Sequence, residues 1–290
     1  MMKKFLTLFL SALFIFALAA CGSAEEDSSS NGSEAGNENG ESSSEEKLEE
    51  VVIGASSTPH AEILEKAKPI LKDKGIKLKI ETYQEYILPN KDLASGAIDA
   101  NYFQHTPYLK EQKEEFDYDF TSLGPVHNEP MGVYSKNITN VDEIPEGTEV
   151  IMRRSESEHG RILSLFEKQG LITLEEGIEK KSATIDDIAE NPKNLKFSPD
   201  VDAGLLPQNY EREEDALVAI NTNYAIEAGL NPTEDSLFIE GDDSPYANLL
   251  VTKTENKDSE ALKTVLEVLQ SEEIRSFIKE EYKGAIVPVK

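Results

Sequence analysis

The side chains most able to do chemistry are concentrated in one segment, residues 98–108. Phe103, Gln104 and His105 end a run that is typical of a short strand. The pair Thr106-Pro107 then indicates a helix start, with threonine as the N-cap and proline in the first helical position. The sequence therefore predicts these side chains at the carboxyl end of a strand, the edge where open α/β sheets bind ligands. A buried aromatic corner with a stacked histidine is the alternative, and the residues alone favour it.

Two further polar residues also follow predicted strands. Arg161 comes after a strand at residues 149–152 and a loop, at the start of a helix. A guanidinium there could bind a carboxylate through two parallel hydrogen bonds. Asn221 ends the buried strand 216–220, and its amide is suited to an ammonium or a carboxylate. A surface arginine that makes only helix contacts is the alternative for Arg161.

The elements that must position these residues alternate between strand and helix. A β-branched run at residues 51–55 predicts a buried strand, and a helix at 60–74 and a strand at 76–80 complete a βαβ unit. Such units lead to parallel sheets. Residues 116–126 are interpreted as a connection. Further expected elements are a strand at 131–135, helices at 160–169 and from Thr184, a strand at 246–252, and helices at 259–269 and 272–282.

Composition and the absence of certain motifs exclude several classes of function. The chain has 290 residues and a formal charge of −27, which argues against nucleic-acid binding and against lying flat on anionic lipid. It contains no Gly-x-Ser-x-Gly, phosphate-loop or His-Glu-x-x-His motif, so we do not expect an enzyme. A hydrolytic site assembled from distant residues is the open alternative.

The amino terminus predicts export and anchoring. Lys3 and Lys4 precede an apolar stretch, which makes residues 1–20 a secretory signal too short for a convincing membrane span. The following Cys21 is the only cysteine, and Leu-Ala-Ala-Cys resembles a bacterial lipobox, which implies cleavage and lipidation there. A plain signal peptide with a free thiol is the alternative. Residues 21–50, rich in Ser, Gly and Glu, are expected to be a disordered tether.

Residues 101–109, Asn-Tyr-Phe-Gln-His-Thr-Pro-Tyr-Leu, closely resemble the signature of the NlpA family of methionine-binding lipoproteins, the solute receptors of bacterial ABC importers. The resemblance covers nearly all of 51–290 and includes residues 58–64, 125–132, 220–225 and 244–248. It implies a two-lobed α/β fold of the periplasmic-binding-protein type (type II-like), with the ligand in the cleft between lobes. The chain is expected to cross between the lobes twice, near Tyr134 and near Pro245. Two such connections would suit closure of the cleft by a hinge motion. We expect lobe 1 at 51–135 and 245–290, and lobe 2 at 136–244.

The resemblance also assigns roles. In the family a Gly-Arg pair holds the ligand carboxylate, and Gly160-Arg161 matches it. The family's ligand-contacting asparagine is the first of two, which is Asn221 here. ABC permease and ATPase subunits are implied as partners, and neither a cofactor nor a metal is expected. A side-chain pocket is expected from lobe 1, formed by Tyr86, Phe103, His105 and Tyr108. The residues alone predict an amino acid with an apolar tail, and only the resemblance implies methionine.

One stretch departs from the family pattern. Members usually carry Pro-Asn-Asp-x-x-Asn just before the Gly-Arg, whereas this chain reads Arg-Arg-Ser-Glu-Ser-Glu-His at 153–159. Glu158 takes the place of an asparagine that would help hold the head group. It could pair with Arg161 and compete with a ligand carboxylate, or it could bind the ammonium while Arg161 keeps its role. Arg153 and Arg154 add positive charge at the same edge.

Three alternatives to methionine as the ligand are considered. Another amino acid or a short peptide would keep the receptor class. A metal receptor is the third, because the chain has four histidines: His60, His105, His127 and His159. They are scattered along the sequence without close spacing, so we expect structural or ligand-contacting roles for them.

Overall fold

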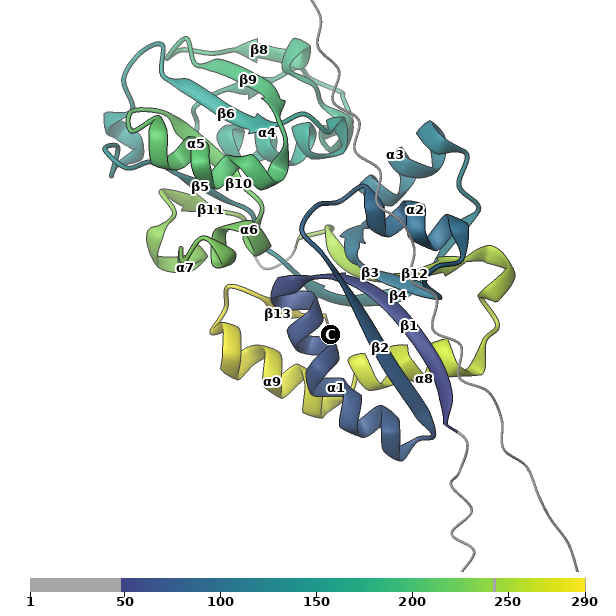
Figure 1. The fold of residues 1–290 in the computed structure, drawn as a ribbon. Helices are drawn as coiled ribbons and strands as arrows, with labels where there is room; N and C mark the ends of the chain where they lie inside the picture. The colour runs from purple at the N-terminus through teal and green to yellow at the C-terminus, as the bar shows by residue number, and fades with distance from the viewer. Residues whose placement is uncertain (1–47, 242–243, 290) are drawn as a thin grey trace, which may run out of the picture. The chain divides into compact units, whose positions relative to one another are not determined.

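The computed structural model describes residues 48–241 and 244–289 (Figure 1). The expected signal peptide, the lipidation site Cys21 and nearly all of the expected tether lie outside the described residues. The first strand, β1 (Glu49–Ser56), begins two residues earlier than expected, so it includes the last two residues of the expected tether. In the described part of the chain, no helix has both the length and the apolar character needed to cross a bilayer.

The first sheet has six strands. In spatial order they are β13 (Val287–Pro288), β4 (Phe120–Asn128), β12 (Ala247–Lys253), β3 (Ala100–His105), β1 and β2 (Ile76–Tyr83). The strands β1, β2 and β3 are parallel, as the βαβ pattern predicts, whereas β12 runs antiparallel to both β3 and β4. Helices α1 (Glu62–Asp73), α8 (Glu260–Leu269) and α9 (Glu272–Tyr282) pack on one face, and α2 (Leu88–Ser95) and α3 (Thr106–Phe116) on the other (Figure 1).

The second sheet has five strands. In order they are β11 (Phe238–Ile239), β5 (Gly132–Tyr134), β10 (Leu217–Ile220), β6 (Glu149–Arg153) and β9 (Lys196–Val201). Here β6 is parallel to both β10 and β9, and β5 is antiparallel to β10. Helix α4 (His159–Lys168) buries its apolar stripe against one face, while α5 (Leu206–Arg212) and α6 (Thr222–Glu227) join a core on the other. Shorter elements are β7 (Thr173–Leu174), β8 (Ile188–Glu190) and α7 (Pro232–Asp235).

The chain passes from the first sheet to the second between β4 and β5, and returns between β11 and β12. Each sheet with its helices forms a lobe, so the molecule has the two-lobed α/β architecture that the sequence predicts. The boundary differs in one detail, because the strand expected at 131–135 in lobe 1 is β5, which pairs with β10 in the second sheet. The first crossing therefore precedes this strand.

Two expectations about secondary structure were wrong. Residues 116–126 contain most of β4, whose register against β12 shifts near Gly124-Pro125, and these two residues interrupt any alternating pattern. The helix expected from Thr184 is a single 3₁₀ turn, Ile185–Asp187, followed by β8. Thr184 and Asp187 do form a capping box there, so the start signal is real. The chain turns into β8 because Ile188 and its neighbours pair with β7.

Candidate functional site

A buried cavity of about 30 Å³ lies where strands of both sheets end. It is bordered by the carboxyl end of β3, by the last residue of β6, and by Asn221 directly after β10. All seven residues predicted to bind a ligand line it: Tyr86, Phe103, His105, Tyr108, Glu158, Arg161 and Asn221. The sequence did not place Glu129, Thr222 or Asn248 there, and it placed Arg153 only at the same edge.

The corner between β3 and α3 is capped by His105 rather than by Thr106. The His105 Nδ1 accepts a hydrogen bond from the Tyr108 backbone N–H at 3.2 Å, and Thr106 is already helical. Because Nδ1 is an acceptor, the ring proton lies on Nε2, which donates to a carboxylate oxygen of Glu158. The histidine thus links the helix start in one lobe to an acidic group in the other.

Glu158 is fully buried and surrounded by hydrogen-bond donors, two of which belong to arginines. Besides His105, its carboxylate lies 3.4 Å from Arg161 Nη1 and 3.5 Å from Arg153 Nη1. Burial alone would raise the pKa of Glu158, but His105, Arg161 and Arg153 hold that pKa well below its usual range. Glu158 is therefore ionised. Of the two arrangements expected for it, pairing with Arg161 or binding a ligand ammonium, the structure contains the pair with Arg161.

Arg161 is the most heavily bonded side chain of the cavity. Its Nε and Nη2 donate to one carboxylate oxygen of Glu240 at 3.0 and 2.6 Å, and Nη2 also donates to the Glu129 carbonyl at 2.6 Å. Its guanidinium lies 4.5 Å from the centre of the Tyr246 ring. Burial opposes the charge, yet Glu240 and Glu158 raise the pKa of Arg161 above its ordinary value. A permanent cation thus borders the cavity, and among the described residues its Nη1 edge is held only by the long contact to Glu158.

Gly160 precedes this arginine because nothing larger fits. A Cβ there would lie 2.3 Å from the backbone oxygen of Lys180, and backbone cannot move aside as a flexible side chain can. The close approach sets the position of the first turn of α4 and hence of Arg161.

Gly160→Ala is accordingly expected to destabilise the fold by about 1–3 kcal/mol, the usual cost of overpacking. Urea denaturation measures the change. Gly204→Ala is the matched control, since its Cβ would meet only the Tyr224 side chain at an ordinary 3.7 Å. Equal stability of the two variants would contradict this explanation of Gly160.

Asn221 presents an unused acceptor. It is the N-cap residue of α6, 8% exposed, and its Oδ1 has no hydrogen-bond partner among the described residues. A buried acceptor left unpaired costs free energy, so this oxygen on the cavity wall is available to a further hydrogen-bond donor. The nearby Asn223 is buried on α6 and accepts a hydrogen bond of 2.6 Å from the Tyr86 hydroxyl.

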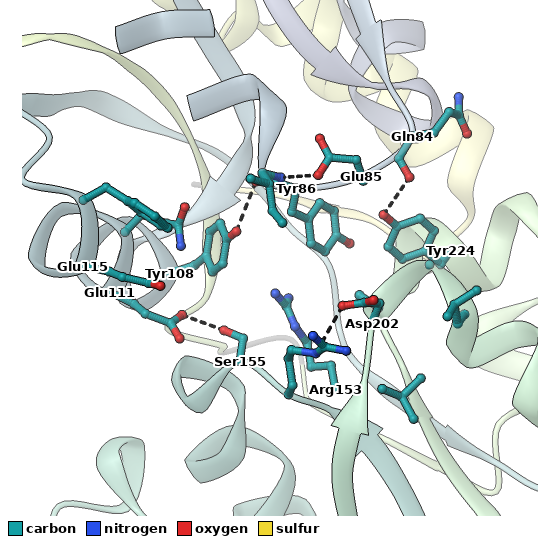
Figure 2. Close-up of a pocket in the computed structure, with 18 residues that line it drawn as sticks. Gln84, Glu85, Tyr86, Tyr108, Glu111, Glu115, Arg153, Ser155, Asp202 and Tyr224 are labelled. Carbon is teal, nitrogen blue, oxygen red and sulfur yellow. Dashed lines mark hydrogen bonds and ion pairs between the residues drawn. The ribbon is translucent and has the colours of Figure 1, made fainter. Parts of the chain in front are cut away.

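Three of the residues expected to form a side-chain pocket lie close together, with a charged neighbour. The ring centres of Tyr86, Phe103 and Tyr108 lie 5.9–6.3 Å apart. The Arg153 guanidinium lies 5.0 Å from the centre of the Tyr86 ring and 5.2 Å from that of Tyr108. Arg153, Tyr86 and Tyr108 also border a second cavity of about 700 Å³. Its other lining residues include Tyr224, Glu85 and Glu111 (Figure 2).

Two of the four histidines come together although the sequence spaces them 67 positions apart. His60 Nε2 and His127 Nε2 lie 3.1 and 2.8 Å from the same carboxylate oxygen of Glu129. His127 Nδ1 accepts from the Tyr102 hydroxyl, and His60 Nε2 also lies 3.1 Å from Asn248 Oδ1. These contacts use both Nε2 positions for hydrogen bonds. Burial lowers the pKa of His60 to about 4 and that of His127 to about 3, so both rings are neutral at pH 7.

Known proteins resemble the chain over this whole region. The model of the NlpA lipoprotein family matches residues 51–290. The methionine-binding lipoprotein MetQ of Bacillus subtilis is 42% identical over 99% of both chains, and the D-methionine-binding lipoprotein MetQ of Escherichia coli K12 is 38% identical over 82% of this chain and 86% of its own. A Burkholderia cenocepacia nutrient-binding protein solved with bound methionine superposes with a TM-score of 0.78 at 36% identity, over 83% of this chain and all of its own. These matches confirm the resemblance seen in the sequence: the chain belongs to the NlpA lipoprotein family, whose members bind solutes and are not enzymes.

Proposed function

We propose that this protein is the extracytoplasmic receptor of an ABC importer, anchored through a lipid on Cys21, and that it delivers L-methionine or a closely related amino acid to the permease. The names of its relatives and the methionine-bound neighbour support the ligand class. The signal sequence and lipobox-like stretch support the anchor. The permease and ATPase partners follow from the family.

The observation that carries the proposal is a pair of complementary groups on one buried cavity. Arg161 offers its Nη1 edge to a carboxylate, and Asn221 offers an unpaired Oδ1 to an ammonium. An amino acid has both groups on one carbon atom, so it can satisfy the two side chains at once. Charge-assisted hydrogen bonds of this kind are about twice as strong as neutral ones.

The ring cluster would take the ligand's tail. Each sulfur–aromatic contact contributes roughly 0.3–1.5 kcal/mol, and burying a methionine-sized side chain adds about 1.5–3 kcal/mol. Together with the head-group contacts, these terms support micromolar binding, about −8 kcal/mol.

Ligand entry requires the lobes to move. A cavity of about 30 Å³ is the size of a water site, far too small for an amino acid. Several contacts across it join the two lobes, among them His105 with Glu158 and the Tyr86 hydroxyl with Asn223. We propose that these contacts break as the lobes separate about the β4–β5 and β11–β12 connections, in the manner of hinged receptors.

Mass spectrometry of small molecules released from the denatured, freshly purified protein tests the function. One amino acid at near-stoichiometric amount is the expected result. Calorimetric titration of the refolded, ligand-free protein with that compound should then give a micromolar or lower Kd. A released peptide would change the ligand class, and zinc retained through dialysis would favour the metal-receptor alternative.

A further inference from the structure

The two lobes also touch outside the inner cavity, through two hydrogen bonds that border the outer cavity. The Tyr224 hydroxyl of the second lobe donates to the backbone carbonyl of Gln84 in the first lobe at 3.1 Å. The Ser155 hydroxyl, also in the second lobe, donates to the Glu111 carboxylate in the first lobe at 2.6 Å. Figure 2 shows these two bonds, here named the outer contacts, on either side of the Tyr86 ring.

The outer contacts lie apart from the groups that would meet the ligand. All four of their residues line the outer cavity, and none of the four lines the inner cavity, where Arg161 and Asn221 lie. None of the four belongs to the ring cluster that would take the ligand's tail. The outer contacts therefore join the lobes without forming part of the ligand site.

Helix α6 connects the first of the outer contacts to the head-group site. Its N-cap, Asn221, borders the inner cavity. Tyr224 follows three residues later, is 7% exposed, and has its ring 5.1 Å from the ring of Tyr86 in the other lobe. Glu227, one turn further along the same face of α6, accepts a hydrogen bond from the Ser57 hydroxyl of lobe 1. A displacement of α6 would thus change the head-group site and the contacts with lobe 1 together.

The loop before Glu158 carries the second outer contact. Ser155 lies directly after β6 and before the 3₁₀ turn Glu156–Glu158. Its single hydroxyl proton is donated to Glu111, so the Ser157 hydroxyl, 2.8 Å away, donates to Ser155 in turn. Because Glu158 ends this turn and borders the inner cavity, the second contact also joins the head-group site to lobe 1.

Bonds of this kind affect the release of a ligand more than its entry. Each outer contact joins atoms of different lobes, so it breaks when the lobes separate about the two crossings. Such a bond stabilises the closed arrangement relative to the open one. A ligand enclosed between the lobes leaves only after both bonds have broken, whereas a ligand that enters the open form meets neither of them. The net stabilisation of one hydrogen bond corresponds to a factor of about 2–10 in a rate or an equilibrium.

We propose that Tyr224 and Ser155 are positioning residues that hold the lobes closed around the ligand and set the rate at which it leaves. This inference rests on the proposed function. It adds two groups outside the ligand site that control how long the receptor keeps its ligand.

Stopped-flow tyrosine fluorescence with L-methionine tests the inference, in a chain with 10 tyrosines and no tryptophan. The dependence of the observed rate on methionine concentration gives the association and dissociation rate constants separately. Tyr224→Phe and Ser155→Ala should each raise the dissociation rate constant about 2–10-fold. The double variant should raise it by about the product of the two factors, because the two bonds share no partner. The association rate constant should stay unchanged in all three variants.

Tyr83→Phe is the matched control for Tyr224→Phe. The Tyr83 hydroxyl donates to the Asp92 carboxylate at 2.6 Å, and both residues belong to lobe 1, so this bond is kept whether the lobes are closed or open. The dissociation rate constant of the control should equal that of the wild type. The comparison separates the loss of a hydroxyl, which both variants share, from the loss of a bond between the lobes.

Small-angle X-ray scattering of the ligand-free protein gives a second readout, which needs no ligand. The double variant should have a larger radius of gyration than the wild type, because it favours the open arrangement. Where methionine binds, the release rates decide: dissociation rate constants equal to that of the wild type in all three variants would overturn the inference and leave the receptor function intact. If the wild type does not bind methionine, the proposed ligand fails. The scattering then decides the inference alone, and an unchanged radius of gyration in the double variant would overturn it.

Discussion

Arg161→Ala is expected to abolish ligand binding, raising Kd at least a hundredfold for whichever amino acid the wild type retains. The substitution removes the cation whose Nη1 edge faces the inner cavity, and Arg153, which also lines this cavity, stays paired with the other carboxylate oxygen of Glu158. Titration calorimetry on the ligand-free protein measures the loss. An affinity within fivefold of the wild type would contradict the head-group assignment.

The same substitution also has a structural cost that must be separated from binding. It leaves the carboxylates of Glu158 and Glu240 without their main cation, and breaking a buried pair costs about 3–5 kcal/mol. Adding Glu240→Gln to Arg161→Ala removes one stranded charge and should recover part of the stability. It should recover none of the affinity. Thermal denaturation and calorimetry of the single and double variants distinguish the two effects.

Acidification is expected to destabilise the fold strongly between about pH 6.5 and 4. His60 and His127 have pKa values of about 4 and about 3 in the folded protein, because burial disfavours the charged rings, whereas an unfolded histidine titrates near 6.5. The unfolded state therefore binds more protons in this window, and stability falls as pH falls. A shift of this size corresponds to roughly 3 kcal/mol for one histidine.

Two carboxyl groups modify the acid response. Burial raises the pKa of Glu129, so its protonation favours the fold as pH falls and offsets part of the loss. The depressed pKa of Glu158 acts in the same direction as the histidines, since its stabilisation is lost in acid. Urea denaturation at pH 7, 5.5 and 4.5 measures the net effect. Histidine NMR titration is the control: normal titration of His60 or His127 near pH 6.5, or a flat stability profile, would refute the prediction.

Local signals made much of the site predictable. The turn from β3 into α3 is encoded by Thr106-Pro107, and the start of α4 by the glycine before Arg161, so both corners were placed from the sequence. Only the capping group differed, because the ring of His105 reaches the helix N–H groups before the threonine hydroxyl does. Apolar periodicity placed α1, α8 and α9, whose buried stripes form one core.

The rest of the site depends on pairings that no short window contains. Glu240 meets Arg161 from 79 positions away and follows a two-residue strand that has no pattern of its own. Glu129 was overlooked because it lies in a connection, and because His60 joins it and the nearby His127 only in the folded protein. Arg153 was noted for its charge alone, since only the folded protein shows that it lies against Glu158 and the rings of Tyr86 and Tyr108.

Arg161 has a consequence that reaches beyond the cavity. It bonds the Glu129 carbonyl in the first crossing and the Glu240 carboxylate at the start of the second. The Arg161 side chain thus forms hydrogen bonds to both of the chain segments that connect the lobes. A ligand that competed for this cation would change both links at the same moment, and loading and the mutual tilt of the lobes would then be thermodynamically coupled. A transporter that senses the tilt would thereby distinguish a full receptor from an empty one without touching the cargo.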